Sequence, residues 1–123
     1  MWPRRAPMRS ALLDVRSTVR FRGEQEALDP MAGHIPGTRN APHTDCMQPD
    51  CSFRPAAELY AHVDALLHGT HAGDCILYCG SGVTAAHTAL ALQHAGHQVP
   101  RVYAGSWSEW ITDAARPVAT GNN

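Results

Sequence analysis

The 123-residue chain contains no lysine, carries no marked excess of charge of either sign and has no long apolar run. Its ten cationic residues are all arginine and face eleven acidic residues, so the formal net charge is −1. Nucleic-acid binding proteins usually need a basic stripe, and a membrane-spanning helix needs roughly 20 consecutive apolar residues. Because both features are missing, we expect the protein to contact neither nucleic acid nor membrane.

Cysteine is too scarce for a small secreted scaffold held by disulfides, because only four cysteines accompany a hydrophobic content of 44%. A domain of this length builds its core without such cross-links, so we expect free thiols and a cytoplasmic location. Cys46 and Cys51 form an incomplete ligand set with His43, and we therefore expect no metal and no other cofactor. We expect Cys46 and Cys51 to be loop cysteines without a role. The alternative is that one of them forms a disulfide or redox pair with Cys79.

The chain does contain an alternation of apolar runs and helical patterns. Short apolar runs that end in turn residues predict four strands, at residues 11–15, 40–42, 74–79 and 99–104. Helical periodicity and capping residues predict three helices, from Pro55 to the stop at Gly69, over 83–95, and a short one after Gly105. A turn is expected at residues 16–18 and mostly loop at residues 20–40.

Strands that alternate with helices are typical of a parallel sheet with helices on both faces, and such sheets bind ligands beyond the carboxyl ends of their strands. The sequence therefore predicts one α/β domain of four or five parallel strands over residues 10–121, preceded by a frayed or disordered lead-in at residues 1–9. We expect Cys75 in the core. Trp107 and Trp110 are expected to be core anchors.

Cys79 stands at the end of the most apolar strand, directly before a loop of small residues and a helix. Gly80 and Gly82 allow backbone N–H groups to turn inward, and the positive end of the following helix points to the same place. Both effects favour thiolate over thiol, and the thiolate is the nucleophile, while Ser81 and Thr84 add hydroxyl groups at the rim. The alternative is a packed structural cysteine at an ordinary strand-to-helix turn.

One comparison of motifs narrows the reaction at Cys79. Cysteine-dependent phosphatases place an arginine six residues after the cysteine, where its guanidinium binds the phosphoryl group with two hydrogen bonds. The sixth residue here is Ala85. The loop therefore lacks the phosphate clamp, and phosphatase and arsenate reductase chemistry are disfavoured.

Four segments of the chain follow one another in a recognisable order. They are Leu13-Asp14-Val15-Arg16 with Arg20-Phe21-Arg22-Gly23, then Gly33-His34-Ile35-Pro36-Gly37-Thr38-Arg39-Asn40, Cys79-Gly80-Ser81-Gly82-Val83-Thr84-Ala85, and Gly105-Ser106-Trp107-Ser108-Glu109-Trp110. Together they resemble the rhodanese family, in the form found in 3-mercaptopyruvate sulfurtransferases. The resemblance covers residues 11 to 121, and it implies a rhodanese-like fold and a sulfurtransferase.

The resemblance also implies roles for individual residues. Cys79 would take a sulfane sulfur from a small anionic donor, become a persulfide and pass the sulfur to a thiol, a protein thiol or cyanide. Ser81 would polarise the donor or relay a proton, and Arg20 would hold the carboxylate or sulfonate of the donor. The remaining substrate-binding positions are Gly80, Gly82, Val83 and Thr84, and Trp107 would wall the pocket as the alternative to a core anchor. Thiosulfate-specific relatives carry cations just after the cysteine, so this neutral loop favours 3-mercaptopyruvate over thiosulfate.

The chain departs from the family pattern in two ways. It resembles only the C-terminal catalytic domain of the two-domain members, in which the active site faces another rhodanese-like domain. Pairing with such a domain, or a homodimer, would cover the same face. A second donor-binding arginine is also missing, because its place falls on Asp29 or, in a shifted register, on Ala27; Arg22 and Arg39 are the candidate substitutes.

These departures leave a second class of function open beside the enzyme. A weakly active rhodanese-like module could bind a partner chain, or it could relay persulfide sulfur between proteins. The intact Cys79 loop favours the enzyme, and the absence of a second domain favours the module.

Overall fold

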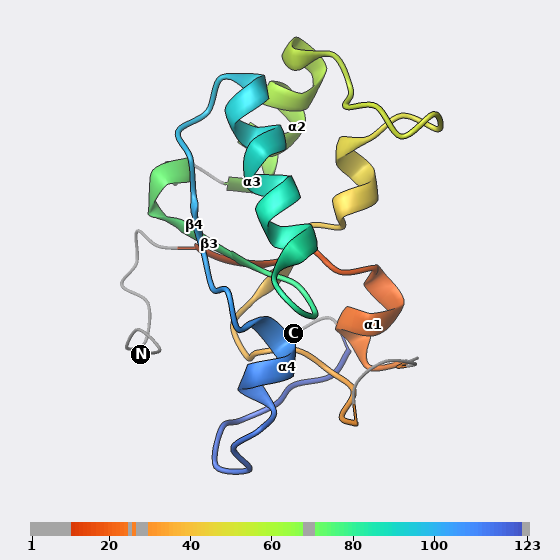
Figure 1. Ribbon diagram of the computed structural model, residues 1–123, viewed down its shortest axis with the longest axis vertical. Coiled ribbons are helices and arrows are strands. Elements are labelled where there is room, and N and C mark those ends of the chain that lie inside the picture. The colour runs from red at the N-terminus through yellow and green to blue at the C-terminus, as the bar shows by residue number, and fades with distance from the viewer. Residues whose placement is uncertain (1–10, 25, 27–29, 68–70, 122–123) are drawn as a thin grey trace.

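The computed structural model describes residues 11–24, 26, 30–67 and 71–121, so the predicted lead-in at residues 1–9 lies outside the described part (Figure 1). Within that part, four parallel strands form one sheet in the order β2-β1-β3-β4. Their bounds are β1 Ala11–Asp14, β2 Arg39–Asn40, β3 Cys75–Tyr78 and β4 Arg101–Val102. The predicted parallel α/β sheet is confirmed.

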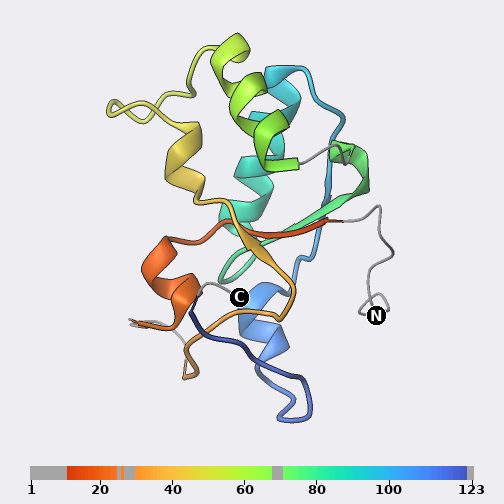
Figure 2. The same cartoon turned by 180° about the vertical axis from the view of Figure 1, so that it is seen from behind.

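The helices lie on both faces of this sheet, as predicted. Their bounds are α1 Thr18–Arg22, α2 Ala56–Leu67, α3 Val83–Ala95 and α4 Ser106–Trp110, with single 3₁₀ turns η1 His43–Cys46 and η2 Ala72–Asp74. Figures 1 and 2 show α2 and α3 together on one side of the sheet, and α1 and α4 on the other. No helix of the described residues is long and apolar enough to cross a membrane.

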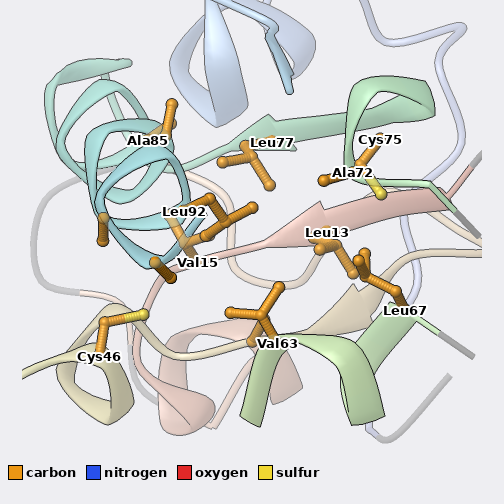
Figure 3. Close-up of a cluster of buried hydrophobic side chains, with 14 of the residues drawn as sticks. Leu13, Val15, Cys46, Val63, Leu67, Ala72, Cys75, Leu77, Ala85 and Leu92 are labelled. Atoms are coloured by element: carbon orange, nitrogen blue, oxygen red, sulfur yellow. The ribbon is translucent and has the colours of Figure 1, made fainter. Parts of the chain in front are cut away.

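Two apolar clusters hold these layers together. The larger one joins alternate residues of β1 and β3, such as Leu13 and Leu77, to the buried stripe of α2 and the small-residue face of α3 (Figure 3). Strand side chains alternate between faces, so Tyr78 points the other way and packs with Ile35, Trp107 and Trp110. The sheet is therefore covered on both sides, as parallel sheets are, and Cys75 lies in the larger cluster as expected.

A buried ion pair ties β1 to the second cluster. The Asp14 carboxylate accepts hydrogen bonds from Nε and Nη2 of Arg16 at 3.1 and 2.7 Å, and both side chains are buried. The Arg16 guanidinium also lies 4.8 Å from the Trp107 ring centroid, which is within cation–π range. Because Arg16 leaves the sheet at its carboxyl edge, the pair fixes the start of the β1–α1 connection against α4.

The main error of the sequence prediction is α1, which occupies residues expected to be turn and loop. This single helical turn carries no apolar stripe in its sequence. Its helical conformation depends on Gly23, which is left-handed at φ 78° and donates its N–H to the Arg20 carbonyl, and on the burial of Phe21 against the ring of His34. Tertiary contacts therefore decide the helix, and they place Arg20 at the carboxyl edge of the sheet.

Boundaries elsewhere shift by small amounts. The second strand begins and ends earlier than expected, at Arg39–Asn40, and β4 is shorter than predicted because only Arg101 and Val102 pair with β3. Helix α2 begins just after Pro55, whose carbonyl accepts the Leu59 N–H, and its predicted stop at Gly69 lies outside the described residues. Helix α3 has the predicted bounds, and left-handed Gly96 closes it.

Candidate active site

Cys79 follows β3 at the carboxyl edge of the sheet, and its side chain is buried with 2% exposure. The Sγ atom accepts backbone N–H groups from Gly82 at 3.0 Å and from Ala85 at 3.2 Å. Ala85 lies in the first turn of α3, where N–H groups have no partner within the helix and carry the positive end of the helix dipole. Two donors and a helix end thus converge on one sulfur, an arrangement that stabilises negative charge there.

The start of α4 holds the loop from the opposite side. The Ser106 hydroxyl accepts the Cys79 N–H at 3.1 Å, donates to the Tyr103 carbonyl at 2.9 Å and lies 4.0 Å from Sγ. Ser108 donates to the Gly80 carbonyl through its backbone N–H at 2.9 Å and its hydroxyl at 2.7 Å. Figure 1 shows α4 next to the β3–α3 loop. These bonds fix the main chain on both sides of the sulfur.

The conformation of the loop requires a glycine at position 82. Its φ of 101° lies in the left-handed region that side chains disfavour, and a Cβ at this position would overlap the Ala104 carbonyl oxygen. The close approach of the β4–α4 connection leaves no room for a side chain here, and the Gly82 N–H donates to Cys79 Sγ. Glycine is therefore necessary here for both space and backbone angle.

Arg20 of α1 reaches the same loop from a third direction. Its guanidinium nitrogens lie 3.4 and 3.5 Å from where a Cβ of Gly80 would be, so the charged group covers this glycine. Arg20 Nη2 pairs with the Glu26 carboxylate at 3.0 Å, and the other carboxylate oxygen of Glu26 lies 3.6 Å from Arg16. Glu26 therefore connects the arginine beside the loop to the buried Asp14–Arg16 pair.

The other predicted site residues lie along the same loop with different exposures. The Ser81 side chain faces solvent, and Val83 is 76% exposed although it begins α3. Gly80 and Thr84 are half-buried, and the Thr84 carbonyl accepts the Thr88 hydroxyl. The structure thus brings all the predicted loop residues and Arg20 to one edge of the sheet, with the sulfur beneath an exposed rim.

The candidate substitutes for a second donor-binding arginine do not reach this loop. Arg22 pairs with Glu24 on the surface at 3.4 Å, and Arg39 donates to the Leu66 carbonyl at the end of α2. The expected position at Asp29 or Ala27 lies outside the described residues. Trp107 is fully buried and donates its indole N–H to the Met31 carbonyl, which agrees with a core anchor rather than a pocket wall.

The remaining cysteines have environments unlike that of Cys79. All four thiols are free, Cys46 and Cys75 are buried, and Cys51 is exposed on a turn. Burial raises the pKa of the Cys75 thiol to about 11, and it also raises the pKa of Cys46. No group of three or more metal-ligating side chains is present among the described residues.

These environments predict a sharp order of thiol alkylation in the native protein. With a pKa of about 11, only about one Cys75 side chain in 1000 is a thiolate at pH 8. We expect iodoacetamide at pH 8 to modify Cys51 within minutes and to leave Cys46 and Cys75 unmodified, as measured by peptide mass mapping. Chemically unfolded protein, the control, should react at every cysteine. Labelling of native Cys75 as fast as Cys51 would contradict its burial.

Sequence reasoning missed three contributors to this site. The sequence shows Ala85 only as the residue in place of a phosphatase arginine, yet its N–H is one of the two donors to Sγ. Ser106 stands in a motif that gives it no role, and its φ of 55°, unusual for a residue with a side chain, has no signature in the sequence. Glu26 lies in a segment without periodicity, so only the fold brings it to Arg20.

The strand order and the loop at the carboxyl edge of the sheet place the protein in a class of α/β domains. In this class, backbone N–H groups donate hydrogen bonds to a cysteine sulfur. The sequence matches the model of the Rhodanese-like domain over residues 4–113. The chain therefore belongs to the rhodanese family, and the resemblance found in its motifs is confirmed.

Named relatives show the same relationship. The chain is 55% identical over 112 residues to a Pseudomonas aeruginosa protein named "Probable 3-mercaptopyruvate sulfurtransferase". The alignment covers 91% of this chain and 39% of that protein. It is 44% identical over 111 residues to a Mycobacterium tuberculosis protein named "Putative thiosulfate sulfurtransferase SseB", and the alignment covers 89% of this chain and 38% of that protein. The chain thus spans about two-fifths of these relatives.

A solved structure shows the same fold. The 3-mercaptopyruvate sulfurtransferase of Leishmania major superposes with a TM-score of 0.75 and 33% identity, covering 90% of this chain and 32% of that one. The α/β architecture of the described residues is therefore that of known rhodanese-fold sulfurtransferases.

Proposed function

We propose that the protein is a sulfurtransferase that moves a sulfane sulfur from a small anionic donor, through a Cys79 persulfide, to a thiol, a protein thiol or cyanide. The observation that carries the proposal is the pair of N–H groups from Gly82 and Ala85 on the Cys79 sulfur. A thiolate or persulfide anion is stabilised by such main-chain donors. Relatives named as sulfurtransferases support the same activity.

In the first half-reaction, the Cys79 thiolate attacks the sulfur of 3-mercaptopyruvate. A sulfur–sulfur bond forms, the carbon–sulfur bond breaks, and its electron pair leaves on the pyruvate enolate. The proton of the donor thiol then passes to the enolate carbon, so the products are pyruvate and the persulfide anion. Ser81, exposed on the loop, is the group we assign to polarise the donor carbonyl or relay this proton.

Arg20 is the group we assign to the donor carboxylate. Its planar guanidinium covers Gly80 and suits a carboxylate better than a lysine ammonium would. Because Glu26 shares the charge of Arg20, the net positive field at the loop is small. A weak field favours a monoanionic donor with an enolate leaving group over the thiosulfate dianion, so we propose 3-mercaptopyruvate as the preferred donor.

In the second half-reaction, the persulfide anion takes a proton from solvent, and an acceptor thiolate attacks its outer sulfur. The sulfur–sulfur bond breaks, the acceptor leaves as a persulfide, and the Cys79 thiolate is regenerated. Cyanide would react in the same way and leave as thiocyanate. The cycle needs a reduced Cys79 and thiol acceptors, which is why we retain a cytoplasmic location as part of the proposal.

A second candidate function is persulfide relay or partner binding by a weakly active module. It is favoured by the share of the relatives that this chain spans, about two-fifths, and by the exposed Val83 at the loop. A second rhodanese-like domain or a second copy of the chain could cover this face. Such a module would accept sulfur from a protein persulfide but react slowly with small donors.

The direct test is the intact mass of the protein after brief incubation with each donor. We expect 3-mercaptopyruvate to add one sulfur atom to most of the protein, with dithiothreitol removing it, because the bound N–H groups stabilise the adduct. Thiosulfate should give a smaller fraction in the same time. Tandem mass spectrometry should map the added sulfur to Cys79.

The variant Arg20→Met is the control for donor recognition. We expect about tenfold slower persulfide formation at low 3-mercaptopyruvate and recovery at high concentration, because the lost contact weakens binding rather than the attack itself. Arg101→Met removes the same charge from an exposed position on β4 and should have no effect. If no donor adds sulfur, the enzyme proposal fails and the module is favoured.

A further inference from the structure

Glu26 lies between two arginines and contacts them unequally. Its Oε2 accepts a hydrogen bond from Nη2 of Arg20 at 3.0 Å, and its Oε1 accepts one from Nε of the same arginine at 3.4 Å. The distance from Oε1 to Nη1 of Arg16 is 3.6 Å, which is an ion-pair contact longer than a hydrogen bond. The Glu26 side chain is only 5% exposed, so protein groups rather than water must stabilise its charge.

Arg16 has hydrogen-bond donors that the fold does not use. Its Nε and Nη2 donate to the Asp14 carboxylate, and Nη2 also donates to the Gly33 carbonyl. Its Nη1 is buried and makes no hydrogen bond to any group of the described residues. A buried donor without an acceptor destabilises a protein, and such groups are rare in native structures. An acceptor is near, because the Glu26 carboxylate lies just beyond hydrogen-bond distance.

The surrounding aromatic rings hold Arg16 in place. Its guanidinium carbon lies 4.8 Å from the ring centroid of Trp107 and 6.0 Å from that of Tyr78, and both rings are fully buried. Arg16 therefore cannot turn toward another acceptor without disturbing this packing. A hydrogen bond at its Nη1 requires a movement of the Glu26 carboxylate instead. A shift of roughly 0.7 Å would bring Oε1 to the ordinary N–H···O distance of about 2.9 Å.

A donor bound at Arg20 would supply the reason for such a movement. The two terminal nitrogens of Arg20 lie next to Gly80, and one of them, Nη2, also donates to Glu26. A donor carboxylate at this edge of the guanidinium brings a second negative charge close to Glu26. Two partly buried carboxylates at such a distance repel each other, and a second cation with unused donors relieves the repulsion.

We propose that Glu26 is an exchangeable counter-ion that determines which donors the protein accepts. In the free protein it is hydrogen-bonded to Arg20, and when a donor carboxylate binds Arg20 it moves onto Nη1 of Arg16. The side chains of Asp14, Arg16, Arg20 and Glu26 together have no net charge, so a thiosulfate dianion leaves twice the negative charge of a monoanion. Glu26 is thus a specificity-determining residue. This inference rests on the proposed function, in which Arg20 binds the donor.

The alternative explanation is that Glu26 only fixes the position of Arg20. That explanation accounts for the two hydrogen bonds between them but leaves Nη1 of Arg16 without an acceptor in every state of the protein. The two explanations also differ in their consequences. A purely structural Glu26 would affect all donors alike, whereas an exchangeable counter-ion would affect donors according to their charge.

The variant Glu26→Gln tests the effect of the charge on donor selection. We expect the ratio of kcat/KM for thiosulfate to kcat/KM for 3-mercaptopyruvate to rise at least about tenfold, mainly through a lower KM for thiosulfate, because removing a nearby negative charge favours a dianion more than a monoanion. Glu24→Gln is the matched control, because it removes the same charge from an exposed side chain that pairs with Arg22. An unchanged ratio in Glu26→Gln, or an equal rise in both variants, would overturn the proposal.

NMR of the arginine side chains tests the movement itself without any turnover. The full chain with Cys79→Ser is titrated with pyruvate, a monoanionic carboxylate, and ¹H–¹⁵N spectra of the guanidinium groups are recorded. We expect saturable shifts of the Arg20 signals and a downfield shift of an Nη1 proton of Arg16 as it gains an acceptor. Adding Glu26→Gln should remove the Arg16 shift and keep that of Arg20. A response of Arg20 without one of Arg16 would overturn the exchange.

These experiments separate the failure of this inference from the failure of the proposed function. If no donor forms a persulfide, sulfur transfer fails, while joint shifts of Arg20 and Arg16 would still support the exchange. If the protein is active and only Arg20 responds, the exchange is wrong and sulfur transfer stands. Absence of a response at Arg20 would contradict both. If Glu26→Gln does not fold, the titration of Cys79→Ser alone decides.

Discussion

The Cys79→Ser variant should lose sulfur transfer by at least about 10³-fold in kcat/KM, which corresponds to about 4 kcal/mol of transition-state stabilisation. Serine keeps the size of the side chain, and its oxygen can accept the same N–H groups of Gly82 and Ala85. It cannot, however, ionise at neutral pH or form a persulfide. Steady-state assays with 3-mercaptopyruvate and cyanide, followed as pyruvate and thiocyanate, measure the loss.

Two controls make this result specific. Circular dichroism and the melting temperature of Cys79→Ser should match those of the wild type, because the hydrogen bonds around residue 79 are retained. Cys51→Ser removes an exposed thiol on a turn that is far from Cys79 in the sequence, and this variant should keep full activity. Sulfur transfer that survives in Cys79→Ser would mean that another thiol is the nucleophile, and the proposed mechanism would be wrong.

The second large effect is expected for Gly82→Ala. The added Cβ meets a backbone φ of 101° and the carbonyl oxygen of Ala104, so the loop must move away from the β4–α4 connection. We expect a loss of about 3 kcal/mol or more in the free energy of unfolding, from strain and overlap together. Because the Gly82 N–H then leaves the sulfur, sulfur transfer should fall about 10²-fold, as when one anion-stabilising donor is removed.

Gly37→Ala is the matched control for this substitution. Gly37 also has a positive φ, 83°, but a Cβ there would meet nothing within 4 Å. It should therefore lose only the conformational contribution, about 1–2 kcal/mol, and keep full activity. Chemical denaturation measures both variants. If the two lose the same stability and Gly82→Ala stays active, the contact with Ala104 does not hold the loop.

Arg20 illustrates why the active site involves more than its loop. Its partner Glu26 also approaches the buried Arg16, which pairs with Asp14 of β1 and lies against Trp107. A donor carboxylate that binds Arg20 must therefore share the guanidinium with Glu26. In the proposed mechanism, this coupling keeps the net charge beside the loop small.

The local pattern of the sequence was sufficient to predict a large part of the fold and of the cysteine loop. The run from Asp74 to Cys79, followed by two glycines and a helical segment ended by Gly96, predicted β3, the cysteine loop and the bounds of α3. These features depend on neighbours in the chain: apolar burial, glycine dihedral angles and helix capping. The same pattern led to the rhodanese family, which the family match confirms.

Tertiary structure alone decided the rest, because the remaining features join residues far apart in the chain. α1 is helical because Phe21 is buried against His34, and no hydrophobic periodicity in the sequence predicts this helix. Ser106 meets the Cys79 N–H only after β4 pairs with β3. Local propensity encodes the elements and the reactive loop, whereas burial and long-range hydrogen bonding determine what surrounds them.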